Sequence, residues 1–153
     1  MDVVGRLNVD PSSILIPEAP QQAPGSLEIV VPYTSPEITS RVVEKAAALA
    51  LGLNAVLKLV AVYIAPYPAD LSCPVSMHEH LTARLTKIAE RTCLPSTIHL
   101  VVARDQDTGF RSALRPGSAV LLGGPRRFWP TREEKLARRL AGAGHHVLLL
   151  HFD

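Results

Sequence analysis

The residues with the clearest capacity for chemistry are the glycines and arginines of Gly123-Gly124-Pro125-Arg126-Arg127. They follow Ser118–Leu122, an apolar run that is typical of a buried strand. Glycine lets a backbone N–H approach a ligand closely, and arginine supplies positive charge and forked hydrogen-bond donors. This combination suits a phosphate group. A tight turn that carries two solvated arginines has the same sequence, so both interpretations stay open.

Other groups of reactive side chains lack the spacing of catalytic or metal sites. His78-Glu79-His80 lacks the i, i+4 spacing of a helical metal pair, and neighbouring helical positions point in different directions. His145 and His146 stand at the start of an expected strand, where successive side chains face opposite ways. The chain has no G-x-S-x-G, Walker or H-E-x-x-H motif. We therefore expect no enzymatic activity.

Alternating strands and capped helices would position the glycines and arginines. Five apolar runs indicate strands: Leu27–Tyr33, Val56–Ile64, Ile98–Ala103, Ser118–Leu122 and His146–Phe152. Four segments between them indicate helices: Ser35 to Gly52, about Met77 to Thr92, a short one over Thr108–Leu114, and one after the capping box Thr131-x-x-Glu134. Short, right-handed connections then favour an α/β fold, a doubly wound five-stranded parallel sheet in the order 3-2-1-4-5 with helices on both faces.

A sheet of this kind binds ligands beyond the carboxyl ends of its strands, where the strand order reverses. That point lies between the first and fourth predicted strands. The first strand would deliver Tyr33 and Thr34 to this crevice, and the fourth would deliver the segment Gly123–Arg127. Tyr33 has the shape to stack on a base, and packing on a neighbouring helix is an equal alternative.

Length and composition indicate one globular domain. The chain has 153 residues, of which 47% are hydrophobic and 20% charged, and its formal net charge is +2. So small a charge does not predict a nucleic-acid partner. Basic residues gather between Arg126 and Arg139, but Glu133 and Glu134 lie among them, which favours an ordinary solvated helix face.

The sequence also predicts where the protein resides and how it is divided. No apolar run approaches the roughly 20 residues that cross a bilayer, so we expect no membrane partner. No signal peptide is visible and Cys73 and Cys93 form no C-x-x-C pair, so we expect a cytoplasmic protein. Residues 1–26 are expected to form an arm, in which Ile14-Leu15-Ile16 docks on the body or on a partner subunit. Residues 27–153 are expected to form the domain.

The last predicted strand would lie at an edge of the sheet, and it contains the apolar run Val147-Leu148-Leu149-Leu150. An exposed apolar edge strand tends to pair with another chain unless something covers it. We therefore expect a homodimer that forms through the last strand.

Several segments resemble the universal stress protein (UspA-like) family over residues 27–153. Ile29–Glu37 is similar to the family's opening, in which a strand ends in V-P and x-D-G-S-E follows. Leu59–Val62 resembles its second strand, and Val120–Gly124 lies where the family has its fourth strand and phosphate loop. The resemblance implies an adenine-nucleotide alpha-hydrolase-like fold and frequent dimers. It also implies ATP or AMP in some members and no nucleotide in others.

Two departures from the family pattern concern the nucleotide. Thr34 stands where the ATP-binding pattern has an aspartate. The family's phosphate motif is G-x-x-G, nine residues, then G-S or G-T, whereas here Arg126 follows Gly123 in the place of the second glycine and no such pair comes after it. We therefore expect ATP binding to be weak or absent.

Two functions remain open. The first is a stress-response binding module with a degenerate nucleotide site, which responds to ATP, AMP or another phosphate-bearing ligand. Its ligand-binding residues would be Tyr33, Thr34, Val62, Gly123, Gly124, Arg126 and Arg127. The second is a stress-related interaction protein with no small-molecule ligand, which the missing aspartate and Gly-Ser pair favour. The sequence names no signalling partner for either function.

Overall fold

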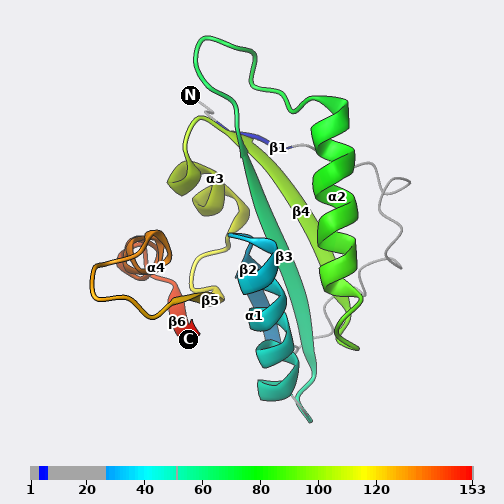
Figure 1. Ribbon diagram of the computed structural model, residues 1–153, viewed down its shortest axis with the longest axis vertical. Coiled ribbons are helices and arrows are strands. Elements are labelled where there is room, and N and C mark those ends of the chain that lie inside the picture. Colours follow the sequence, from blue (N-terminus) through cyan, green and yellow to red (C-terminus); the bar gives the residue numbers. More distant parts are fainter. Residues whose placement is uncertain (1–3, 7–26, 51, 153) are drawn as a thin grey trace.

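A six-stranded sheet with two helices on each face forms the described part of the chain (Figure 1). The computed structural model describes residues 4–6, 27–50 and 52–152. The strands are β1 Val4–Arg6, β2 Leu27–Pro32, β3 Ala55–Ile64, β4 Ser96–Ala103, β5 Ala119–Pro125 and β6 His146–Phe152. The helices are α1 Pro36–Leu49, α2 Val75–Ala89, α3 Gln106–Ala113 and α4 Arg132–Gly142.

The strand order is β1-β4-β3-β2-β5-β6, and every neighbouring pair from β4 to β6 is parallel. The predicted order of five parallel strands is therefore confirmed. The sixth strand, β1, comes from the predicted arm and runs antiparallel to β4, with Val4 opposite Ala103. A strand of three residues in a proline-rich segment leaves no periodic pattern, so it was not predicted. The rest of the arm, including Ile14–Ile16, lies outside the described residues.

The two faces of the sheet bury separate apolar clusters. Helices α1 and α2 cover one face, where Val31, Val43 and Leu85 are fully buried. Helices α3 and α4 cover the other face, where Phe110 and Leu140 are buried against Val60. Strand β3 is central and contributes to both clusters, which explains its nearly continuous apolar sequence. Within the described ranges, no helix has the length and apolar character needed to cross a membrane.

Helix α1 begins as its sequence predicts and ends earlier. The Ser35 hydroxyl oxygen accepts a hydrogen bond from the Ile38 N–H at 3.3 Å, and Pro36 occupies the first helical position. The helix ends at Leu49 rather than at Gly52. Gly52 has a φ of 80° and lies in the turn that leads into β3, where its missing side chain allows the left-handed backbone.

One charged residue, Lys58, interrupts the apolar pattern of β3. Its side chain is buried, and its ammonium group donates a hydrogen bond of 2.7 Å to the carbonyl oxygen of Ala113. Ala113 is the last residue of α3, where carbonyl oxygens lack partners within the helix and carry partial negative charge. Lys58 thereby fixes the end of α3 to the centre of the sheet.

Gly109 sets how closely α3 approaches β3. A Cβ atom at this position would lie 2.5 and 2.7 Å from the two methyl groups of Val62. We expect Gly109→Ala to lower the free energy of unfolding by about 1–3 kcal/mol, because the core must then shift. Gly142→Ala, in a helical position with no atom near the added Cβ, should instead raise it by up to about 1 kcal/mol. Chemical denaturation followed by circular dichroism measures both changes, and a Gly109→Ala variant as stable as the parent would contradict the close packing.

Candidate functional site

The crevice predicted between the first and fourth parallel strands is present. Strands β2 and β5 pair only at Ile29 with Ala119 and at Val30 with Val120, and beyond these positions they no longer pair. A hollow of about 70 Å³ lies at this end of the sheet, on the side of α3 and α4. It is lined by Thr34, Gln106, Arg132, Glu133 and Leu136.

Two helices begin at this hollow. Gln106 is the first residue of α3 and Arg132 is the first residue of α4. Each helix has its own cap: the Asp105 carboxylate accepts from the Thr108 N–H at 2.8 Å, and the Thr131 hydroxyl oxygen accepts from the Glu134 N–H at 3.2 Å. The amino end of a helix carries partial positive charge, so two such ends border a single small space, which the exposed residue Arg132 also lines.

Glu133 gives the same space a negative charge. A Cβ atom on Gly124 would lie 3.0 Å from the Cβ of Glu133 and 3.6 Å from its Oε2 atom. The carboxylate therefore lies against the part of β5 where a phosphate was expected. A volume of about 70 Å³ is also far below the roughly 300–1,000 Å³ of sites that enclose drug-sized ligands. Together with Thr34 in the place of an aspartate, this lining does not fit a nucleoside triphosphate.

The two glycines lie within a strand, whereas the sequence predicted a loop after it. Gly123 and Gly124 belong to β5 and pair with Leu150 and His151 of β6. A side chain at Gly123 would collide with Val42 of α1 and would lie 2.7 Å from the Phe152 ring. The glycines are therefore needed for close packing, and this requirement produces the same sequence as a phosphate loop.

The two arginines predicted to bind an anion lie outside the hollow. Arg126 and Arg127 follow β5 with exposed side chains, and the Arg126 N–H donates to the Phe152 carbonyl oxygen at 3.1 Å. Arg132, which the sequence did not single out as a ligand residue, lines the hollow instead. The sequence feature that could have identified Arg132 is the capping box at Thr131, because the residue after a cap starts the helix and lies beside the strand ends.

The other predicted residues divide between the two faces of the sheet. Thr34 lines the hollow, and its N–H donates to the Thr39 hydroxyl oxygen at 3.2 Å. Tyr33 packs against the apolar cluster below α1 and α2, and its N–H donates to the Val60 carbonyl oxygen at 2.7 Å. Val62 is half-buried beside Gly109 of α3. Of these three residues, only Thr34 is part of the lining.

Comparisons with known proteins define the fold. No model of a protein family matches the chain, and no curated protein sequence matches it either. Among solved structures, a universal stress protein from Archaeoglobus fulgidus is similar, with a TM-score of 0.50 and 17% identity over 80% of this chain and 92% of that chain. A universal stress protein in complex with cAMP is similar over 82% of this chain and 96% of that chain, with a TM-score of 0.50 and 14% identity. The chain therefore has the fold of the universal stress proteins, as the sequence resemblance predicted.

The cap of α3 makes the stability that this helix start contributes depend on pH. Hydrogen bonds from the Thr108 N–H and hydroxyl hold the pKa of Asp105 below its usual value. Because the folded state favours the ionised cap, its stabilisation is complete above the ordinary aspartate pKa and is lost as the pH falls through the lowered pKa. We expect Asp105→Ala to reduce the free energy of unfolding by about 0.5–2 kcal/mol at neutral pH and by less in acid.

Thermal unfolding of the parent and Asp105→Ala across the acid range measures this difference. Asp70→Ala, which removes an exposed carboxylate from a loop, serves as the control. A difference for Asp105→Ala that stays constant as the pH falls would contradict the role of the ionised cap.

Proposed function

We propose that the protein is a non-enzymatic module of the universal stress protein type that binds a phosphate-sized anion in the hollow between α3 and α4. The observation that carries the proposal is the position of Arg132, which lines a polar hollow at the crevice between β2 and β5. Thr34 and Gln106 add a hydroxyl and an amide to the lining. Guanidinium, hydroxyl and amide groups all donate hydrogen bonds, so together they suit an oxyanion.

Glu133 limits which anion can bind. Its carboxylate repels a second negative charge, and the repulsion grows with the charge of the ligand. A monoanionic or dianionic phosphate is therefore a better ligand than ATP, and AMP would have to leave its nucleoside outside the small hollow. This ranking agrees with the sequence-based expectation of weak or absent ATP binding.

The second candidate is an interaction protein without a small-molecule ligand. Glu133 favours it, because a resident carboxylate beside Gly124 supplies the negative charge that the two helix ends attract. The caps at Asp105 and Thr131 each accept one N–H group of their helix. In this case the crevice needs no ligand to be stable.

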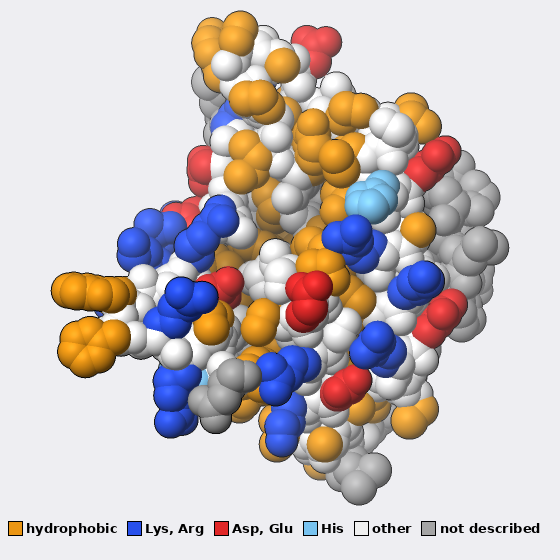
Figure 2. All heavy atoms as spheres, viewed as in Figure 1, with side chains coloured by type: hydrophobic (Ala, Val, Ile, Leu, Met, Phe, Trp, Pro, Cys, Tyr) orange, Lys and Arg blue, Asp and Glu red, His pale blue; other side chains and the backbone are white. Residues whose placement is uncertain are grey.

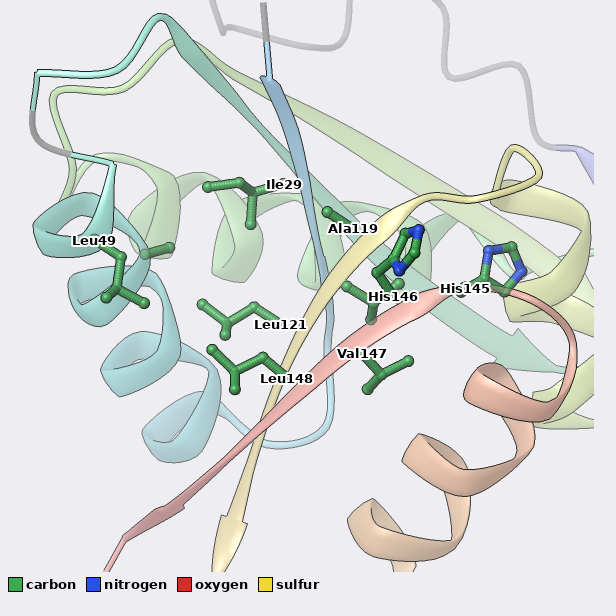
Figure 3. A pocket seen from close by; sticks show the side chains of 10 residues that line it. Ile29, Leu49, Ala119, Leu121, His145, His146, Val147 and Leu148 are labelled. Atoms are coloured by element: carbon green, nitrogen blue, oxygen red, sulfur yellow. The ribbon is translucent and has the colours of Figure 1, made fainter.

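We propose that the protein forms a homodimer, which is compatible with either function. Strand β6 lies at the edge of the sheet, as predicted, and beside it is an apolar groove of about 520 Å³. Figure 3 shows Leu121 and Leu148 on the same side of the sheet as Leu49 of α1, with His145 and His146 at the other end of the groove. We propose that a second copy of the chain covers this groove and the β6 edge.

Exposure and polarity at the groove support this arrangement. Leu148 is 51% exposed and Leu49 is 57% exposed, which is high for large apolar side chains that line the same groove. His145 has a buried Nδ1 atom without a hydrogen-bond partner among the described residues. A partner subunit at the groove would exclude water from the leucines.

The anion site predicts a specific effect of one arginine. We expect inorganic phosphate to raise the melting temperature of the parent, and Arg132→Ala to weaken phosphate binding about tenfold or more through loss of a charge-assisted contact. Arg126→Ala serves as the matched control, because Arg126 is exposed like Arg132 but does not line the hollow. Differential scanning fluorimetry with phosphate, AMP and ATP measures both variants. If no anion stabilises the parent, the site does not exist and the interaction protein is the better assignment.

If the groove is the dimer contact, a charged side chain introduced into it should prevent dimer formation. We expect Leu148→Lys to yield a monomer, because a charged side chain at the centre of an apolar contact cannot be buried without a partner. Val75→Lys, which changes an exposed apolar residue at the start of α2, should leave the assembly intact. Light scattering coupled to size-exclusion chromatography gives the mass of each, and a monomeric parent at micromolar concentration would rule out the dimer.

A further inference from the structure

The loop between β5 and α4 carries the most exposed aromatic pair of the described chain. Phe128 is 96% exposed and Trp129 is 77% exposed, and their ring centroids lie 5.9 Å apart at an angle of 78°. We call these two residues the aromatic tip. Pro125 and Pro130 flank the loop and restrict its backbone. In Figure 2 the hydrophobic side chains at the left, where Figure 1 places this loop, project beyond the body of the molecule.

The acidic and the basic side chains of α4 lie on different sides of the helix. Glu133 lies against Gly124, and Glu134 places its Oε1 atom 3.6 Å from the Nε2 atom of His151 in β6, so both acidic side chains turn toward the sheet. Lys135 and Arg138 are exposed on the same helix. The outer side of α4 is therefore solvated, as predicted from sequence, and its exposed charges there are basic.

The basic surface and the aromatic tip are continuous. Arg126 and Arg127 precede the tip directly, and Lys135 and Arg138 follow it on the first turns of α4. Figure 2 shows Lys and Arg side chains gathered on this flank around the projecting hydrophobic side chains. None of the ion pairs found among the described residues involves these four basic side chains. We call these four residues the basic ring.

An anionic membrane surface fits this arrangement better than other partners. A projecting tip needs no matching pocket when it enters a deformable lipid interface, where the rings of Trp and Phe gain apolar contact at the headgroup level. Positive side chains beside the tip are then attracted to lipid phosphates. A single-stranded nucleic acid would instead need a basic groove that follows its backbone, with aromatic rings along the groove as stacking platforms. The aromatic tip projects from the body of the molecule and lies in no groove.

We propose that the aromatic tip inserts into the headgroup region of an anionic membrane while the basic ring contacts lipid phosphates. The sequence-based expectation of no membrane partner rested on the lack of a spanning segment, and peripheral binding needs none. The surface is distinct from the anion site, because neither the tip nor the basic ring lines the hollow. The two proposals therefore succeed or fail separately.

The protein contains its own probe for this binding, because Trp129 is its one tryptophan. We expect vesicles of phosphatidylcholine and phosphatidylserine to shift Trp129 emission to shorter wavelength, and acyl chains labelled with bromine to quench it. Vesicles of phosphatidylcholine alone should have little effect, and added salt should reverse the shift. An unchanged emission together with no co-sedimentation on the anionic vesicles would overturn the proposal.

Variants locate the binding surface. We expect the double variant Arg126→Gln and Arg127→Gln to weaken partitioning about 20–30-fold, at about fivefold for each basic residue near the surface. Phe128→Ser should weaken it about tenfold or more and leave Trp129 as the probe. Matched controls remove a basic residue from the other face of the sheet, Lys87→Gln, and an exposed aromatic residue from another loop, Tyr67→Ser. Equal losses in the controls, or binding to single-stranded RNA in place of vesicles, would refute a membrane-binding tip.

Discussion

The close packing of helices on both faces of β5 is the constraint on which the rest of the structure depends. Because Gly123 has no side chain, α1 and Phe152 pack closely against one face of β5. Because Gly124 has none, Glu133 of α4 packs closely against the other face. Because α4 begins so near the strand, its first turn borders the crevice in the place of a glycine loop. The hollow is small for this reason, and the segment between Pro125 and Thr131 carries its side chains outside the body.

Much of this fold could be predicted from the sequence because apolar runs and helix caps are local signals. The five parallel strands and the starts of α1 and α4 were predicted in this way, and Ser35 and Thr131 cap as expected. Strand β1 was missed, because its pairing with β4 depends on contacts that no local pattern reveals. Lys58 is a similar case, since its partner is 55 residues away at the end of α3.

The candidate site was predictable in place but not in composition. The switch point follows from the strand order, which is why Thr34 was expected there and lines the hollow. The sequence does not distinguish a glycine of a phosphate loop from a glycine that close packing requires. Gly124 was therefore predicted to hold a phosphate, whereas the structure places it against Glu133. The side of α4 on which Glu133 and Glu134 lie depends on the angle at which the helix meets the sheet, and the sequence does not contain that angle. One helix thus supplies Arg132 and Glu133 to the hollow and a basic outer surface to the solvent.

The proposal of an altered anion site rests on the small volume of the hollow and on the Glu133 carboxylate that lies against Gly124. Isothermal titration calorimetry of inorganic phosphate and of ATP into the full chain tests it most directly. We expect heat from phosphate binding and no tighter binding of ATP, because the hollow admits one phosphate group and its carboxylate repels further charge. A dissociation constant for ATP in the low micromolar range would contradict the proposal and would mean that Glu133 moves aside for a whole nucleotide.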